Sequence, residues 1–420
     1  MKNKANLFET GRKKALQILR NATTPTGILA SVTDIDNYQR VFARDAVICG
    51  LAGLVCGDEI VIDGLRYTLE TLAECQGHDG QIPSNVQKGE QGDIIHLSYG
   101  GLAGRVDTIP WFIIGVCNYM KFTGDEVFGE EMLPAVRKGL ELLNAWEFNS
   151  KGLIYVPLSG DWADEYIYHG YIFHDQVLRL WAMRCHDEVF TDQKASGDSE
   201  MLANMLRINY WPTTRGLKSE YIYHPYAALL YLQERGEPRY WLPVLTPGGY
   251  HCQFDGFSNA LAVLIGLSND GQIDQILDHG ELIIEQTGSG LVPVFWPPIL
   301  EGEPLWHELL ANFKYRFKNI PYHSHNGGIW PMVSGWWGLA QIAGNRIEDA
   351  KKMLEAIHLF NRKGEKGTSK WAFYEHGHGK TGEPLGTPRC SWSAAAALLL
   401  EEGLAGKQLL GLEYRPPSEV

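Results

Sequence analysis

The stretch RVFARDAVICGLAGLVCGDE, residues 40–59, places the pair Arg44-Asp45 directly before an apolar segment, 46–56, that contains no charged residue. Apolar residues on every side of a helix predict that the helix is buried on most of its surface. Gly50 and Gly53 have no side chains and would let neighbouring helices approach closely. The stretch therefore predicts a buried helix that begins beside a polar cluster.

The same arrangement recurs along the chain, roughly every 60 to 90 residues. Five further clusters stand at or before apolar segments: Asp107 before 109–120, Asp161 to Asp164 before 171–185, Asp255-Gly256 before 257–267, Asn326-Gly327-Gly328 before 332–343, and Ser391-Trp392-Ser393 before 394–400. Amphipathic helices are expected between them, at 65–75, 133–146, 273–285 and 347–360. We predict an all-α fold, an (α/α)6 barrel made of six helical hairpins in a closed ring.

The alternative architecture is an α-solenoid, whose repeats should resemble one another in sequence. The six segments here do not, so the closed ring is favoured. No linker or shift in composition divides the chain, and we predict a single domain over 1–420.

Composition limits the classes of partner. A net charge of −13 argues against nucleic-acid binding, which needs clustered Lys and Arg. No apolar run is long enough to cross a bilayer, and the N-terminal residues do not resemble a signal peptide. The seven cysteines are scattered and odd in number, which indicates reduced thiols and a cytoplasmic location. The oligomeric state is left open.

Two segments carry acidic residues among aromatic ones. SGDWADEYIYHGYIF, 159–173, holds Asp161 and Asp164 on either side of Trp162, and KWAFYEHGHGKTGEPLG, 370–386, holds Glu375. A helix cap and a solvated surface hairpin are the simpler explanations. Glycoside hydrolysis, however, needs one carboxylic acid to protonate the leaving oxygen and a second carboxylate to activate water or attack.

A third segment, KNIPYHSHNGGIWPMVSGWW, spans 318–337. Its paired glycines allow a close backbone approach to a ligand, and its Asn and His side chains match sugar hydroxyls. Its tryptophans would either stack on a sugar or fill the core. The two HxH pairs, 323/325 and 376/378, have no convincing third ligand, so we expect no metal and no cofactor.

Several ordered stretches resemble the alkaline/neutral invertases and their α-glucosidase, debranching and trehalase-like relatives. HNGGIWP, 325–331, resembles their HNGGxWP; DNYQRVFARDA, 36–46, resembles NYxxVFxRD; and 104–125 resembles their GRV…TGD block. The matches run from about Asn37 to Trp392. Two departures stand out: Glu165 and Tyr166 replace arginines, and GYIFHDQ, 170–176, replaces GY(P)IEIQ.

The resemblance implies an inverting α-glycosidase with Asp164 as general acid and Glu375 as general base. Asp161 is the alternative acid, and Glu383 is the lesser candidate for the base. The sugar would be bound by a set of polar and aromatic residues: Arg44, Asp45, Asp107, Trp162, His325, Asn326, Trp330 and Trp392. The expected partner is a small-molecule carbohydrate, and the two departures put sucrose specificity in question.

Two rival functions remain compatible with the fold, since a helical ring does not dictate its chemistry. A sugar epimerase or isomerase would be expected to rely on paired histidine bases. A catalytically inactive sugar-binding protein would be expected to lose an acid. Both candidate acids are present here, which favours the hydrolase.

Overall fold

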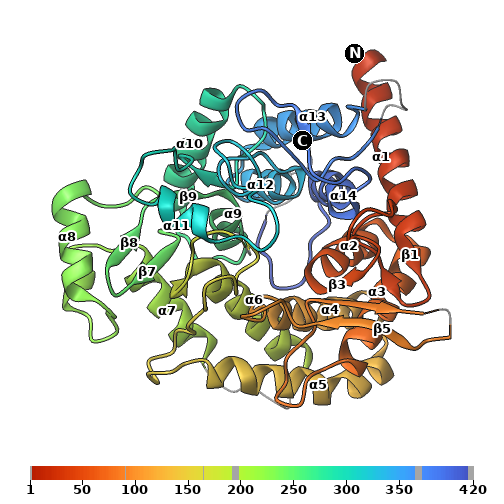
Figure 1. Ribbon diagram of the computed structural model, residues 1–420, viewed down its shortest axis with the longest axis horizontal. Coiled ribbons are helices and arrows are strands. Elements are labelled where there is room, and N and C mark those ends of the chain that lie inside the picture. The colour runs from red at the N-terminus through yellow and green to blue at the C-terminus, as the bar shows by residue number, and fades with distance from the viewer. Residues whose placement is uncertain (1, 90, 164, 192–197, 365–370, 415–420) are drawn as a thin grey trace.

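The computed structural model describes residues 2–89, 91–163, 165–191, 198–364 and 371–414. The chain is predominantly helical, as predicted. Six helices, here called the inner helices, match the six apolar segments: α2 (Ala43–Cys56), α4 (Thr108–Thr123), α6 (Phe173–Val189), α9 (Gly256–Leu264), α12 (Pro331–Ala343) and α14 (Ser391–Leu404). Each inner helix contacts the next one along the chain, and α14 contacts α2. Figure 1 shows them around the middle of the molecule.

The remaining long helices lie outside this set and pack against it. They are α1 (Lys2–Ala22), α3 (Glu59–Glu74), α5 (Glu126–Ala145), α7 (Ser199–Tyr210), α10 (Asp270–Thr287) and α13 (Ile347–Asn361). Two further helices, α8 (Pro225–Arg235) and α11 (Trp306–Ala311), and the 3-10 turn Gly216–Lys218 belong to the connections. Helix α8 projects from the left side in Figure 1.

Short turns of Gly-Asp join inner to outer helices. Gly57 ends α2 and Gly124 ends α4 in the left-handed conformation that glycine adopts readily. The next residue in each case, Asp58 or Asp125, caps the following helix by accepting a backbone N–H. In both places a Gly-Asp pair therefore ends the inner helix, reverses the chain and starts the outer helix.

Short antiparallel strands connect the helices. They pair as β1 (Thr23–Thr24) with β2 (Gly27–Ile28); β3 (Val41–Phe42), β4 (Asn85–Lys88) and β5 (Ile94–Ser98); β6 (Tyr171–Ile172), β7 (Val244–Thr246) and β8 (Gly249–His251); β9 (Phe254–Asp255) with β10 (Phe295–Trp296); and β11 (His376–Gly377) with β12 (Pro384–Leu385). Residues 171–172, predicted as the start of a helix, are strand β6, which pairs with β7 before α6 begins.

Aromatic side chains fill the space between the inner helices. Trp111, Trp181 and Trp336 are fully buried, and their ring centroids lie 5.8–6.2 Å apart. Trp336 and Trp337 thus belong to the core rather than to a sugar-stacking surface. Buried aromatic pairs contribute about 0.5–1.5 kcal/mol beyond the area that they bury.

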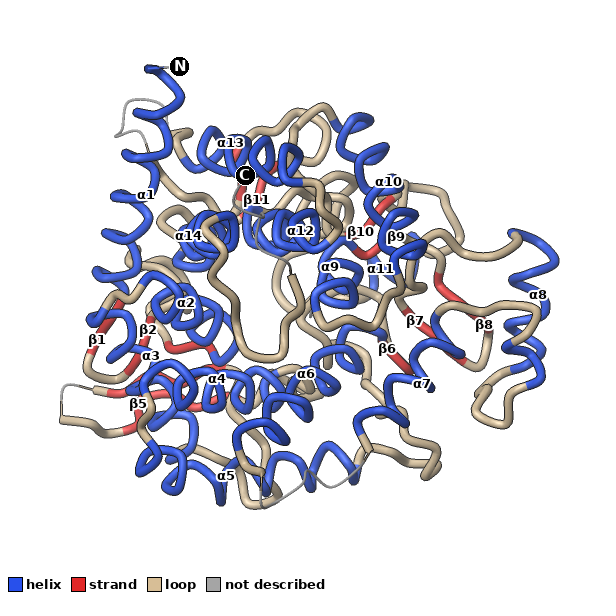
Figure 2. The backbone as a smooth tube through the Cα atoms, turned by 180° about the vertical axis from the view of Figure 1, so that it is seen from behind, coloured by secondary structure: helices blue, strands red, loops and turns tan. Residues whose placement is uncertain are grey.

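The segment 409–414 covers the C-terminal ends of three inner helices (Figure 2). The backbone N–H of Leu410 donates to Asn118 Oδ1 on α4, and its carbonyl accepts from Trp181 Nε1 on α6. Glu413 N donates to the carbonyl of Leu264 at the end of α9. Among the described residues, no helix combines the length and the apolar character that a bilayer span requires.

Candidate active site

The predicted functional residues that the structure describes lie at or near the N-terminal ends of the inner helices, on the side opposite the segment 409–414. Arg44 and Asp45 lie in the first turn of α2, and Asp107 directly precedes α4. Trp330 is the N-cap residue of α12, and Trp392 lies in the first turn of α14. Helix N-termini carry a partial positive charge, which favours carboxylates at this end of the molecule.

Arg44 joins two of the buried carboxylates. Its Nη1 lies 2.7 Å from Oδ2 of Asp107, and its Nε lies 3.9 Å from Oδ2 of Asp45. The guanidinium also lies 5.6 Å from the ring centroid of Trp392. Burial raises the pKa of Asp45 to about 7, although Arg44 opposes the shift and Glu375 adds to it. Asp45 therefore exchanges its proton close to neutral pH.

Trp330 is the centre of the aromatic part of the site. Its ring stacks with His325 at 5.1 Å and with His376 at 5.0 Å, and it meets Trp392 edge-on at 5.5 Å. Its Nε1 donates to the carbonyl of Ser324. Protein groups contact its ring and its N–H, so Trp330 helps to fix its neighbours in place. Its predicted role in sugar binding stays a prediction.

Trp162 connects this aromatic group to the first acidic segment. It meets His325 at 5.0 Å and Trp330 at 5.9 Å, both edge-on, and only 2% of its surface is exposed. Asp161, its neighbour in sequence, is equally buried. Asp164, the predicted general acid, lies outside the described residues.

Glu375 is buried and has two polar partners. Tyr38 Oη donates to its Oε1 at 2.7 Å, and Nδ1 of His376 lies 3.5 Å from its Oε2. Burial alone would raise the pKa of Glu375, but His376, Tyr38 and the more distant Lys318 outweigh it and lower the pKa. Glu375 is therefore a buried carboxylate that stays ionised at neutral pH. Glu383, the lesser candidate, is exposed.

A glycine makes room for the Glu375 carboxylate. Gly386 follows β12 and has a φ of +74°; a Cβ atom there would lie 2.5 Å from Glu375 Oε2 and 2.6 Å from His376 Nδ1. Both contacts are far shorter than van der Waals distance. Only glycine fits at this position without moving one of the two side chains.

The Asn-Gly-Gly stretch packs against the protein itself. The Asn326 amide group donates to the carbonyls of Ile299 and Asn319 and accepts the N–H of Ile299. A Cβ at Gly328 would lie 2.3 Å from the carbonyl oxygen of Ser324. This stretch therefore fixes the loop that carries His325, and the side chain of Asn326, predicted to bind substrate, has its partners within the protein.

In each of the three candidate segments, a residue other than glycine has a positive φ. It stands one or two positions before a predicted site residue. These are Ser159 (66°) before Asp161, Ser324 (45°) before His325, and Phe373 (47°) before Glu375. Such conformations are strained for bulky residues and persist where the surrounding structure holds them, most often at functional sites.

Sequence reasoning did not assign several residues that contact the site: Tyr38, Asp175, Asp255 and His376. Tyr38 lies inside the NYxxVFxRD match, which was a usable signal. Asp255 caps α9 by accepting from Phe257 and Ser258, and its pKa is raised to about 6 by burial. No group of three or more potential metal ligands occurs in the described part of the chain.

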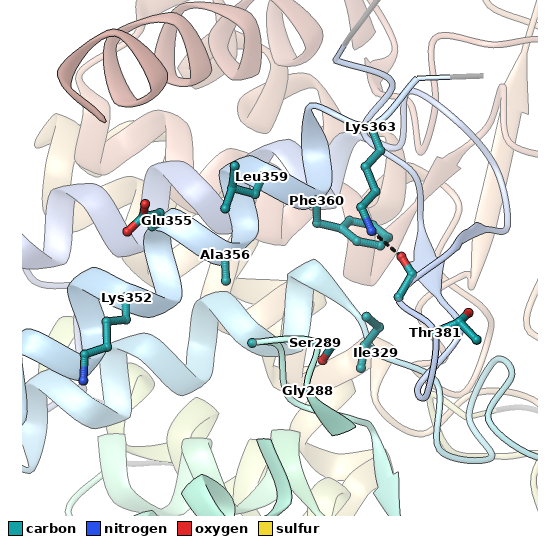
Figure 3. A pocket seen from close by; sticks show the side chains of 12 residues that line it. Gly288, Ser289, Ile329, Lys352, Glu355, Ala356, Leu359, Phe360, Lys363 and Thr381 are labelled. Carbon is teal, nitrogen blue, oxygen red and sulfur yellow. Dashed lines mark hydrogen bonds between the residues drawn. The ribbon is translucent and has the colours of Figure 1, made fainter. Parts of the chain in front are cut away.

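A separate pocket of about 410 Å³ lies between α13, the loop after α10 and the β11–β12 hairpin (Figure 3). Ala356 and Phe360 of α13 and Lys363, which follows it, line the pocket together with Thr381 of the hairpin. Ile329 also lines the pocket and directly precedes Trp330. Among the residues that the structure describes, no predicted catalytic or sugar-binding residue lines it.

Solved structures of similar shape include glycosidases. The chain superposes on a GH63 mannosylglycerate hydrolase from Thermus thermophilus with a TM-score of 0.64 and 14% identity, over 92% of this chain and 99% of that one. A bacterial glucoamylase complexed with acarbose gives a TM-score of 0.60 and 15% identity, over 97% of this chain and 57% of that one. At these identities the likeness shows the fold alone.

Sequence comparison identifies the family to which the chain belongs. Alkaline/neutral invertase E, chloroplastic, from Arabidopsis thaliana is 25% identical over 387 residues, which cover 79% of this chain and 62% of the relative. The chain thus spans less than two thirds of that relative's length. The sequence model of alkaline and neutral invertases matches residues 14–405. Because this match covers nearly the whole chain, the protein belongs to the alkaline and neutral invertase family.

Proposed function

We propose that the chain is a glycoside hydrolase that cleaves an α-glucosidic bond of a small sugar or oligosaccharide with inversion. Asp164 protonates the leaving oxygen, and Glu375 removes a proton from the attacking water. The observation that carries this proposal is the state of Glu375: a buried carboxylate whose pKa is nonetheless lowered, at the end of the molecule where the other candidate residues meet.

A general base must be ionised before it can accept a proton. His376 and the Tyr38 hydroxyl stabilise the charged form of Glu375. Tyr38 occupies Oε1, and His376 lies 3.5 Å from Oε2. Oε2 has the longer and weaker of the two contacts, so we assign the contact with water to this oxygen.

The acid must hold its proton at neutral pH, which burial beside aromatic groups favours. Trp162 is buried two residues before Asp164 and would supply such an environment. Asp161 is the alternative acid. Its carboxyl group, however, caps a turn by accepting the N–H of Ala163, which favours Asp164 for proton transfer.

We propose that the fold is a closed (α/α)6 barrel in a single domain. A closed barrel would support the proposed catalytic pair. The contacts that run from α2 through α14 and back to α2 support closure. Such a barrel brings the N-terminal ends of all six inner helices to one rim. Residues from 44 to 392 in the sequence can then meet one substrate.

The substrate class follows from the groups at this rim. Arg44, Asp45 and Asp107 offer charged donors and acceptors suited to sugar hydroxyl groups. Tyr166, which stands where the invertases have an arginine, is fully buried and donates to Gln253. Loss of that cation favours α-glucosides other than sucrose. A cytoplasmic location stays a prediction; all seven cysteines are free thiols.

The experiment is a screen of sucrose and α-glucosides in which NMR follows the anomeric form of the first product. Inversion should release β-glucose from an α-glucoside. Asp164→Asn and Glu375→Gln should each lower kcat by about 10²-fold or more, since general acid–base catalysis contributes about 10² to 10⁴-fold. Asp161→Asn is the matched control for the acid. Activity that survives in Asp164→Asn but not in Asp161→Asn would reverse the assignment, and α-glucose as first product would exclude inversion.

A further inference from the structure

The segment GYIFHDQ, 170–176, is the departure from the invertase pattern that the proposed mechanism does not use. Where the family pattern reads GY(P)IEIQ, the glutamate position holds His174 and the following position holds Asp175. The acidic residue has therefore moved by one position along the chain. On a helix this places it about 100° around the axis, toward different neighbours.

Asp175 lies in the first turn of α6 and is fully buried. Neither of its carboxyl oxygens accepts a hydrogen bond from another described residue. The carboxyl group of Asp175 lies near that of Asp161, because the adjacent residues His174 and Trp162 have ring centroids 5.9 Å apart. The charge of Asp161 accordingly raises the pKa of Asp175. Oδ1 of Asp161 also lacks a donor among the described residues, whereas the Asp161 carboxyl accepts the backbone N–H of Ala163. Two buried carboxyl groups thus face each other.

The charged groups around this pair do not compensate two negative charges. Asp107 before α4 and Asp255 before α9 add to the negative potential at Asp161. Arg44 of α2 forms its short ion pair with Asp107. In the part of the chain that the structure describes, no Lys or Arg forms an ion pair with Asp161 or Asp175.

The other polar neighbours do not supply a positive charge either. Burial and the charge of Arg44 together lower the pKa of His174 to about 3, so this imidazole is neutral. Tyr210 of α7 is also near Asp175 and stays protonated because burial raises its pKa. Two adjacent buried carboxylates cannot both be ionised without a cation, because each loses its hydration and repels the other.

We propose that Asp161 and Asp175 share one proton, and that Asp175 is a positioning residue that fixes the turn leading to Asp164. The protonated carboxyl donates to the ionised one, so the pair carries a single negative charge at the N-terminus of α6, where the helix favours it. The ionised Asp161 accepts the N–H of Ala163 and so orders the residues directly before the proposed acid. The catalytic part of this inference rests on the proposed function; the shared proton does not.

The direction of the pKa shifts agrees with the geometry. Burial raises the pKa of Asp161, and the charge of Asp107 raises it further. Burial also raises the pKa of Asp175 well above its ordinary range, and the charge of Asp161 adds to the shift. The shared proton is therefore present at neutral pH and is lost as the pH rises. Once it is lost, two like charges repel and the turn shifts, so activity should fall on the alkaline side.

The test compares Asp175→Asn and Asp175→Ala in the full-length chain. Asparagine supplies a permanent N–H donor to Asp161, so kcat should stay within a few-fold of the original and the alkaline decline should disappear. Alanine removes the donor, so kcat should fall by up to about 10²-fold, the scale of a misplaced catalytic group, with a much smaller change in KM. An Asp175→Asn variant that is as inactive as Asp175→Ala, or that keeps the alkaline decline, contradicts the proposal.

Infrared spectroscopy gives a second readout that needs no substrate. At neutral pH the unsubstituted chain should show one more protonated carboxyl C=O band than Asp175→Asn. Asp58→Asn, the same change at a buried aspartate that caps α3, should keep that band. If the protonated-carboxyl C=O band is equally strong in the unsubstituted chain and in Asp175→Asn, the shared proton is refuted. A band difference in a chain that cleaves no glycoside would refute the proposed function alone.

Discussion

At the scale of single residues, the ionisation of Glu375 depends on a small number of hydrogen bonds. Its burial is unfavourable for a charge, yet its pKa is lowered. The Tyr38 hydroxyl is one of the groups responsible, and it comes from a residue 337 positions away in the sequence. A hydrogen bond to a charged group contributes about 1.5–3 kcal/mol. Together with His376, Tyr38 therefore lowers the pH range over which Glu375 loses its charge.

Tyr38→Phe should move the acid limb of the activity profile to higher pH. The folded-state pKa of Glu375 lies below its ordinary value, so the charged form is present above that pKa and is lost as the pH falls through it. Without the hydroxyl the pKa rises, and the loss begins at higher pH. The measurement is kcat/KM against pH, with Tyr240→Phe as control because its hydroxyl bonds the Cys252 carbonyl instead. An acid limb that shifts equally in both variants contradicts the role of Tyr38.

At the scale of elements, the β11–β12 hairpin orients Glu375, the proposed base. His376 pairs with Leu385, and the N–H of Glu375 donates to the carbonyl of Thr387, so the returning strand lies next to Glu375. Gly377 also bonds the backbone of Ile329, which ties the hairpin to the segment that leads into α12. The hairpin is therefore held on one side by its own strand and on the other by the loop before α12.

Gly386→Ala should disable the site with little loss of fold, because its Cβ would meet both Glu375 and His376. Gly382→Ala is the matched control: its φ of +67° is similar, but its Cβ would lie no nearer than 3.5 Å to Lys363 Nζ. Both substitutions should cost about 1–2 kcal/mol of stability, since each forces alanine into the left-handed region. Only Gly386→Ala should reduce kcat by about tenfold or more. Equal activity in the two variants, measured beside urea unfolding, would argue against the contact.

At the scale of the whole molecule, the two ends of the inner helices differ in what they contain: one carries the candidate site, and the other packs against the C-terminal segment. The N-terminal ends hold buried carboxylates, Arg44 and aromatic rings. On the opposite side, segment 409–414 contacts Asn118 of α4, Trp181 in the middle of α6 and Leu264 at the end of α9. Buried tryptophans pack between the inner helices, and one of them, Trp181, also bonds this segment. Stability and activity should therefore respond separately to substitutions at opposite ends.

Asn118→Leu tests this separation. Asn118 is fully buried, and its Oδ1 accepts the N–H of Leu410. Leucine has a similar size but leaves that N–H without an acceptor, which costs about 1–3 kcal/mol. The free energy of unfolding should fall by this amount, while kcat per folded molecule stays unchanged. Ser393→Ala is a comparison at the other end, where the hydroxyl donates to the Tyr374 carbonyl beside Glu375. A fall in kcat for Asn118→Leu would contradict the separation.

The sequence by itself determined the helices and the places where polar clusters meet them. Apolar segments with few charges became buried helices because hydrophobic patterning acts within a few turns of chain. Gly57-Asp58 and Gly124-Asp125 fixed helix ends for equally local reasons. The clusters around Arg44, Asp107 and Glu375 could be recognised because each is contiguous in sequence.

Only the tertiary structure decided what those side chains contact. His325 and His376 stack with Trp330, Asn326 bonds its own loop, and His174 meets Trp162. None of these outcomes is visible in the local pattern. Local sequence sets backbone conformation, whereas the partner of a buried polar group depends on which distant segments pack together. Burial then raises the energetic cost of every unpaired charge. For this reason the carboxyl groups could be found in the sequence, but their protonation could be argued only from the fold.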